Sequence, residues 1–414
     1  MTKTNFARLL AAIAITFAIA NFASSAAAAG RQAYVMLSGW GLYPPASRQS
    51  PIAGAMSDIA KAHVAGIVYG TLGVPPWIRK NRDVPDAFDP NAYNSQLFSL
   101  ARSEGATLWL QLRYYDNWVQ VNGQGRNITA PEITNDGAMR NAFVAAAMET
   151  IGAYAEAFPR DCTIILGEEE TPYHARLGGG LFWAGEQLWD QSVKKGPGEH
   201  LSPSRTIEEN FVRQYASVNS ILISAIRKQH ASCRIGLHIG HYPLYQKLDG
   251  KSEYALALSS MPRIDFTFYD LYQKVSPNEA DFVDKLSKRV AILKQMGQNV
   301  YYLAQLHTTN AFGHGGGRTP SAAGIDRTVA LAERLGVSGL GYYTKNAAPT
   351  MCGAGQAANE NEPPPTARFT AKCDPTEDGN PLDPNARGQN MVFDGSPARW
   401  RYGLGKLQGF LGAR

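Results

Sequence analysis

Short runs of apolar, β-branched and aromatic residues recur along the chain, and most are followed by a segment with helical periodicity. Runs of the first kind predict buried strands, and apolar residues spaced three and four apart predict amphipathic helices. The eight predicted strands are Tyr34–Trp40, Gly66–Leu72, Thr107–Tyr115, Thr163–Glu169, Arg234–Gly240, Asp265–Leu271, Val300–His307 and Val337–Thr344. The clearest predicted helices are Ala138–Ala157, Ile207–Gln229, Glu279–Gln295, Ala322–Leu335 and Pro397–Leu411.

Strands that alternate with helices predict a parallel sheet. Eight such units in a chain of 414 residues are typical of a closed (β/α)8 barrel, the TIM barrel. An open doubly wound sheet is the alternative, but no Gly-x-Gly-x-x-Gly follows the first predicted strand. Three connections, after predicted strands three, four and eight, are long: Asp116–Asn135, Thr171–Ser204 and Asn346–Ser396. All three are expected at the C-terminal face of the barrel, where active sites of this fold are built.

The first 29 residues have the pattern of a secretory signal peptide. Lys3 and Arg8 precede an apolar run from Leu9 to Ala20, and Ala27-Ala28-Ala29 offers small residues for cleavage before Gly30. The apolar run is short for a membrane-spanning helix, which needs about 20 residues. We therefore expect an exported, periplasmic or extracellular protein in which residues 30–414 form a single catalytic barrel.

Composition narrows the function classes. Hydrophobic residues make up 44% of the chain and charged residues 18%, which is enough apolar surface for a large core and excludes wholesale disorder. The net charge is only +5 and the basic residues form no run, so nothing indicates a nucleic-acid partner.

Four cysteines in an exported protein are expected to form disulfides. Cys352 and Cys373 flank a loop rich in Pro and Asn and are expected to pair. Cys162 and Cys233 each precede a predicted strand, and they can pair if those two strands are neighbours. Four cysteines allow three connectivities, so both pairings are hypotheses.

Polar side chains gather toward the strand ends on rows predicted to face the barrel axis. Alternate residues of a barrel strand face inward. In strand three the leucines are assigned to the helices, which turns Trp109, Gln111, Arg113 and Tyr115 inward. The same argument assigns to the interior Ser38 and Trp40, His238 and Tyr242, Asp265, Thr267 and Tyr269, Gln305 and His307, and Tyr343 and Lys345. Val, Ile and Leu would be expected there in a purely structural barrel.

Three successive carboxylates end predicted strand four, in Gly167-Glu168-Glu169-Glu170-Thr171-Pro172. The strand phase turns Glu169 inward, so Glu169 is ranked first, Glu170 second and Glu168 third as a catalytic acid. Close carboxylates repel one another, which raises the pKa of one of them. A carboxyl that stays protonated near neutral pH is what a general acid requires. The alternative is a solvated start of a loop.

Most glycoside hydrolysis needs a second carboxylate. Asp270, at the end of predicted strand six, is the first choice, and Asp116, after strand three, is the next. Each has an alternative interpretation as a helix cap or loop acid. Strands four and six are not adjacent in a barrel, so widely spaced carboxyls and an inverting mechanism are favoured, whereas a retaining mechanism needs a shorter separation.

Aromatic and hydrogen-bonding residues are dense around these acids, as in carbohydrate sites where sugar rings stack on aromatic faces. The expected substrate-binding residues are Trp40, Arg113, Tyr115, Asp116, His238, His241, Tyr242, Tyr269, Gln305, His307 and Tyr343. No His-Glu-x-x-His motif is present, and His238 and His241, three residues apart on a strand, are poorly placed to share a metal. We therefore expect neither a catalytic metal nor a cofactor.

An exported barrel with an acidic motif ending strand four resembles the large clan of barrel glycoside hydrolases. In that clan the acid/base Glu ends strand four, often in Asn-Glu-Pro, and the resemblance gives that role to Glu169 or Glu170. The clan's nucleophile is a Glu that ends strand seven. Here that strand reads Tyr301-Tyr302-Leu303-Ala304-Gln305-Leu306-His307 and holds no carboxylate. This departure implies that the second acid comes from another strand.

The leading hypothesis is an exported glycoside hydrolase acting on a polysaccharide or oligosaccharide by carboxylate acid/base catalysis. The missing strand-seven carboxylate supports one alternative, a non-catalytic carbohydrate-binding barrel. The other alternative is a metal-dependent hydrolase or a lyase on the same fold.

Overall fold

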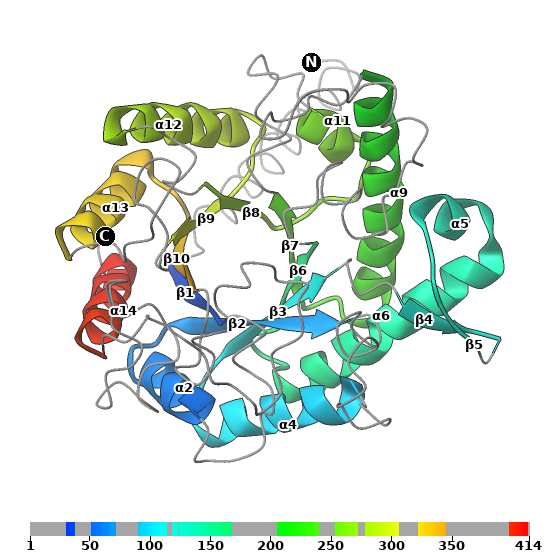
Figure 1. Cartoon of the computed structure of the whole chain (residues 1–414), viewed down its shortest axis with the longest axis horizontal. Coiled ribbons are helices and arrows are strands. Elements are labelled where there is room, and N and C mark those ends of the chain that lie inside the picture. The colour runs from blue at the N-terminus through cyan, green and yellow to red at the C-terminus, as the bar shows by residue number, and fades with distance from the viewer. Residues whose placement is uncertain are drawn as a thin grey trace, which may run out of the picture.

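Eight parallel strands close into a barrel in the order β1-β10-β9-β8-β7-β6-β3-β2, with helices around the outside (Figure 1). The computed structural model describes residues 30–37, 51–71, 90–113, 118–122, 124–167, 205–239, 253–271, 278–305, 322–344 and 397–412. The barrel strands are β1 (Gln32–Leu37), β2 (Ala65–Thr71), β3 (Leu108–Arg113), β6 (Thr163–Leu166), β7 (Arg234–Ile239), β8 (Phe266–Asp270), β9 (Val300–Gln305) and β10 (Gly339–Thr344). This arrangement confirms the predicted TIM barrel.

The helices follow the predicted periodicity closely. They are α2 (Pro51–Lys61), α4 (Pro90–Ser103), α5 (Ala130–Asn135), α6 (Gly137–Ala157), α9 (Arg205–Gln229), α11 (Glu253–Ser259), α12 (Glu279–Gln295), α13 (Ala322–Leu335) and α14 (Pro397–Gly412). Asp136 caps α6, because its side chain accepts hydrogen bonds from the backbone of Ala138 and Met139. At α12 the capping side chain is that of Asn278. Within the described ranges, no helix is both long and apolar enough to cross a membrane.

The connection after β3 is not the structureless loop predicted for Asp116–Asn135. It contains an antiparallel hairpin, β4 (Trp118–Val121) and β5 (Gln124–Asn127), followed by α5. Glu132 accepts hydrogen bonds from the backbone and side chain of Thr129 at 2.9 and 3.0 Å. This capping box, in Thr-x-x-Glu, is the sequence signal that would have placed the start of α5. Figure 1 shows the hairpin and α5 outside the barrel, beside α6 and α9.

The barrel interior is filled by large side chains that face glycines. Its apolar cluster consists of Tyr34, Met36, Ala65, Ile67, Trp109, Ile165, Phe266, Phe268, Tyr301 and Leu303. The Phe266 and Tyr301 rings stack with centroids 4.3 Å apart. A Cβ added to Gly341 would lie 1.9 Å from the Tyr34 ring, and one added to Gly236 would lie 2.2 Å from the Phe266 ring. Glycine is therefore required at both positions, and the part of the interior that this cluster fills is a packed core.

The inward row predicted for the sixth barrel strand, which is β8 in the structure, is wrong. Thr267 faces the helices, since its hydroxyl lies 2.8 Å from that of Tyr254 in α11. Tyr269 also faces them, because its hydroxyl accepts a hydrogen bond of 3.0 Å from Arg289 in α12. The inward row is Phe266, Phe268 and Asp270. Both rows are rich in aromatic residues, so hydrophobicity alone does not distinguish them, and the polar partners on the helices decide the phase.

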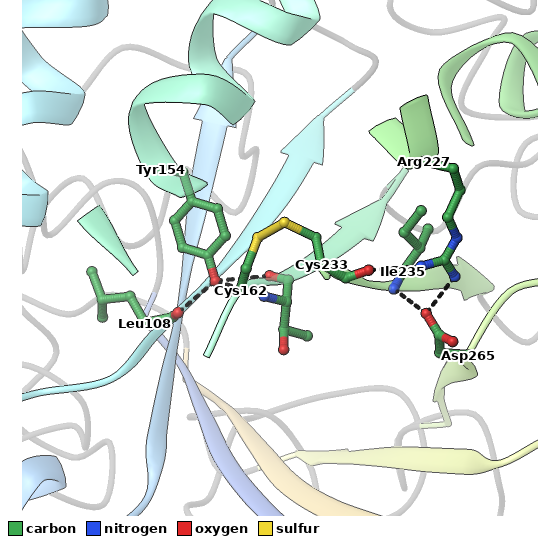
Figure 2. The surroundings of a disulfide bond; sticks show 8 residues. Leu108, Tyr154, Cys162, Arg227, Cys233, Ile235 and Asp265 are labelled. Atoms are coloured by element: carbon green, nitrogen blue, oxygen red, sulfur yellow. Dashed lines mark hydrogen bonds and ion pairs between the residues drawn. A yellow bond between two sulfur atoms is a disulfide. The ribbon is translucent and has the colours of Figure 1, made fainter. Parts of the chain in front are cut away.

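A disulfide joins Cys162 to Cys233, as predicted, at the starts of β6 and β7 (Figure 2). These strands are neighbours, with Thr163 paired to Arg234 in register. Asp265, predicted to face inward, lies beside β7 instead, where it binds Arg227 at 2.6 Å. The predicted Cys352–Cys373 pair and the predicted signal peptide, residues 1–29, lie outside the described residues.

Tyr154 links α6 to two strands. Its fully buried hydroxyl donates to the Leu108 carbonyl at 2.7 Å and accepts from the Thr163 amide at 2.9 Å (Figure 2). We expect Tyr154→Phe to lower the free energy of unfolding by about 1–3 kcal/mol, because both backbone groups lose a buried partner. Urea unfolding would measure this. Tyr402→Phe is the control, since the Tyr402 hydroxyl binds Asp326 at the surface and its loss should change stability little. Equal effects would contradict the role given to Tyr154.

The Cys162–Cys233 bond spans 71 residues of sequence. Replacing both cysteines by Ala is expected to lower the free energy of unfolding by about 2–4 kcal/mol, because the unfolded chain gains conformational freedom. The comparison is best made by urea unfolding in a Cys352→Ala/Cys373→Ala background, where a reductant acts on this bond alone. Reduced protein in that background should match the four-Ala variant. An unchanged midpoint on reduction would show that the bond contributes nothing.

Candidate functional site

Three buried polar side chains lie inside the barrel near the C-terminal ends of the strands. They are Gln111 of β3, His238 of β7 and Asp270 of β8, which we call the polar cluster. Gln111 and Asp270 have no exposed surface, and His238 is 2% exposed. Gln111 lies two residues beyond Trp109, and Asp270 two beyond Phe268, so the cluster rests on the aromatic core. Buried polar groups in such a place are costly unless they bind one another.

The orientation of the Gln111 amide follows from its partners. Gln111 Nε2 lies 2.8 Å from the Gly167 carbonyl and 2.7 Å from His238 Nδ1. A carbonyl only accepts, so the amide must present its NH2 group to both atoms. His238 Nδ1 is then an acceptor, and the ring carries its proton on Nε2. That nitrogen lies 3.6 Å from Asp270 Oδ1, which is an electrostatic contact rather than a hydrogen bond.

The polar cluster also holds the end of β6. Gly167 has φ +79°, a left-handed conformation that favours glycine. Its N–H donates to the Leu112 carbonyl at 3.0 Å, and its own carbonyl is held by Gln111. The fourth predicted strand, which is β6, therefore stops at Leu166 rather than running to Glu169 as predicted. Gly167 is the residue directly before the three glutamates, so Gln111 fixes the point from which that motif begins.

The surroundings of Asp270 hold its backbone in place. The next residue, Leu271, accepts a 3.0 Å hydrogen bond from the Tyr302 hydroxyl. Burial, together with the charges of Tyr269 and Asp270, raises the pKa of Tyr302 well above its ordinary value, so the phenol keeps its proton and remains a donor. On the other side, the His238 ring meets Phe268 edge-on at 4.9 Å. Asp270 is thus fixed on a rigid strand rather than on a loop.

The sequence-predicted residues fall into four groups. Asp270 and His238 lie inside the barrel and are brought together. Tyr269 is buried against α12, so its predicted inward placement is wrong. Arg113, Gln305 and Tyr343 lie at or next to the C-terminal ends of their strands, and nothing is described of their side chains. Outside the described residues, and still predictions, are Trp40, Tyr115, Asp116, Glu168, Glu169, Glu170, His241, Tyr242 and His307.

Gln111 is the member of the polar cluster that sequence reasoning undervalued. It was predicted to face inward, but it was not assigned to the site. The signal was present, because an amide on the same row as Trp109 in a buried strand needs polar partners. In the described part of the chain, no three His, Cys, Asp or Glu side chains gather as metal ligands. Both ring nitrogens of His238 face groups of this chain, Gln111 and Asp270.

No protein-family model and no curated protein sequence matches this chain. Several solved structures are similar. A chitinase catalytic domain from Pyrococcus furiosus is 8% identical with a TM-score of 0.47, and the match covers 93% of this chain and 99% of that one. An endo-β-1,4-mannanase from Thermotoga petrophila is 13% identical with a TM-score of 0.43, covering 76% of this chain and 67% of that one. A β-galactosidase from Marinomonas ef1 is 11% identical with a TM-score of 0.49, covering 77% and 54%.

At such identities and TM-scores, the likeness assigns neither an activity nor a substrate to this chain. The barrel itself rests on the observed strand pairing, and the site rests on its own residues.

The amide orientation predicts that His238 carries its proton on Nε2. Long-range proton–nitrogen correlation spectra of protein with labelled histidine would report this tautomer, and His238→Gln would assign the signal. Gln111→Glu is the matched variant: its carboxylate only accepts, so the proton should move to Nδ1. An Nδ1–H tautomer in the unmodified protein would overturn the arrangement described for Gln111.

Proposed function

We propose that this protein is a glycoside hydrolase that cleaves glycosidic bonds in a polysaccharide or oligosaccharide. Glu169 or Glu170 is the general acid, and Asp270 is the second carboxylate. One observation carries the proposal: the polar cluster places His238 Nε2 3.6 Å from Asp270 and also holds Gly167, next to the glutamates. Three side chains thus connect the two carboxylate positions that the reaction requires.

The roles follow from the chemistry of the groups. The acid protonates the leaving oxygen, and the second carboxylate activates water or attacks the sugar. His238 is a positioning residue, because its Nε2 lies 3.6 Å from Asp270 Oδ1 and a nearby N–H dipole favours the charged form of a carboxylate. Gln111 sets the tautomer that makes this possible.

The strand order favours an inverting reaction. The acid motif follows β6 and Asp270 ends β8, and β7 lies between them. Neighbouring strands are about 4.8 Å apart, so β6 and β8 are separated by roughly 9–10 Å at the backbone. Inverting enzymes hold their carboxyls about 6.5–9.5 Å apart, with water between, whereas retaining enzymes hold them at about 5–5.5 Å.

In this proposal the substrate lies at the C-terminal face and the protein acts outside the cytoplasm. Trp40 stacks on a sugar ring, and Arg113, Gln305, His307 and Tyr343 bind hydroxyl groups. Export agrees with the signal-peptide pattern of residues 1–29 and with the Cys162–Cys233 disulfide, since such bonds persist in oxidising compartments.

A specific observation supports a second candidate, a non-catalytic carbohydrate-binding barrel. Asp270 has no exposed surface, and its charge faces His238. A carboxylate in such a setting can serve to order a core rather than to reach a substrate. In that case the glutamates would only bind sugar, and no bond would be cleaved.

The test is release of reducing ends from a broad panel of bacterial and plant polysaccharides. We expect activity in the unmodified protein and a loss of about 10²–10⁴-fold in both Glu169→Gln/Glu170→Gln and Asp270→Asn, because each removes a group that transfers a proton. Asp284→Asn, on the exposed face of α12, is the control and should keep full activity. Urea unfolding would show that each variant is folded.

Different outcomes separate the two candidates. Sugar binding without turnover would favour the binding barrel. Turnover that survives in the double glutamine variant would place the acid elsewhere. Turnover that survives only in Asp270→Asn would leave Asp116 as the second carboxylate. Proton NMR of the first-formed anomer would then test the inverting stereochemistry.

A further inference from the structure

A separate cavity opens at the opposite, N-terminal end of the barrel. Its volume is about 410 Å³, and its walls come from residues at or next to the starts of β1, β2, β3, β6 and β7. Trp109, which is 3% exposed, lines it from the barrel interior. None of the polar cluster residues lines it. We call it the N-terminal pocket.

Positive charge dominates this pocket. Among the described residues that line it, three are arginines, Arg31, Arg160 and Arg234, and one is an acid, Asp161. Arg31 is partly neutralised, because it pairs with Glu333 at 3.5 Å and lies 4.8 Å from the centroid of the Phe410 ring. No ion pair with a described carboxylate is formed by Arg160 or Arg234.

Two aromatic rings hold the Arg234 side chain in the wall of the pocket. Its guanidinium lies 5.4 Å from the ring centroids of both Phe266 and Tyr301, and it donates to the Tyr301 hydroxyl. Burial raises the pKa of Tyr301, and the charge of Arg234 only opposes this, so the phenol stays neutral and does not cancel the charge. A half-buried guanidinium held by rings retains its ability to bind an anion.

The disulfide holds close together the two backbone segments that carry Arg160 and Arg234. Cys162 is two residues beyond Arg160, and Cys233 directly precedes Arg234. The bond holds the two Cα atoms 4.6 Å apart (Figure 2). Thr107 and Ser232, which also line the pocket, add neutral hydroxyl donors. The backbone that carries both arginines is therefore held in place before any ligand arrives, which lowers the entropic cost of binding.

We propose that the N-terminal pocket binds a small organic anion through a carboxylate or phosphate group, with Arg160 and Arg234 contacting its oxygens. Guanidinium groups match planar or tetrahedral oxyanions through paired N–H donors. Trp109 supplies an apolar surface for the rest of the ligand. The proposal does not depend on the activity at the C-terminal face, because it uses none of the residues placed there.

The experiment is calorimetric titration of the protein with D-glucuronate, inorganic phosphate and D-glucose at constant ionic strength. Glucuronate and glucose differ by a carboxylate, so charge recognition predicts binding of the first and none of the second. We expect Arg160→Gln to weaken anion binding about tenfold or more, since it removes a charged hydrogen bond. Arg334→Gln is the matched control: Arg334 is an exposed arginine in the last turn of α13 and does not line the pocket.

Binding of glucuronate alone would identify a carboxylate ligand, and binding of phosphate alone a phosphorylated one. Arg234→Lys, which keeps the charge but loses the paired donors, should also weaken binding. Three results would overturn the proposal: no saturable binding of either anion, equal binding of glucose and glucuronate, or equal anion affinity in Arg160→Gln and the unmodified protein. The Arg160→Gln variant separates this pocket from the C-terminal face, because Arg160 lines only the N-terminal pocket and sugar bound at the other face would be unaffected.

Discussion

The fit between aromatic rings and glycines inside the barrel is the constraint on which the other features rest. Tyr34 and Phe266 occupy space that a side chain at Gly341 or Gly236 would need. A register slip by one residue would turn every side chain of a strand to the opposite face, so this fit allows one alignment. The same register brings together three residues that lie farther along these strands, namely Gln111, His238 and Asp270.

With the strands aligned in this way, the hydrogen bonds of the polar cluster determine which nitrogen of His238 carries the proton. One amide group satisfies a backbone carbonyl and a histidine nitrogen at once, and the orientation of the amide decides where the histidine proton lies. A change on β3 therefore alters what Asp270 on β8 experiences, although the two strands are not neighbours. Such dependence is expected where buried polar groups share partners, since each bond polarises the next.

Much of the scaffold could be predicted from the sequence because local periodicity reports burial directly. The glutamine–leucine alternation of β3 gave its inward row, and Cys162 and Cys233 paired because the strands after them are adjacent. The predicted phase of β8 was wrong because aromatic residues line both of its faces. The polar partners that decide the phase, Tyr254 and Arg289, lie on the helices before and after the strand, where the strand pattern does not report them. The contact of His238 with Gln111 was equally inaccessible, because it joins β3 and β7 across β6, and local sequence patterns do not report contacts between strands.

The disulfide has a consequence for the integrity of the chain in a protease-rich setting. Cys162 and Cys233 bracket the whole segment between β6 and β7, including α9. A single backbone cut anywhere within that segment would leave two fragments that remain covalently joined at paired strands. The bond therefore keeps the N-terminal and C-terminal parts of the barrel in one covalent molecule after such a cut.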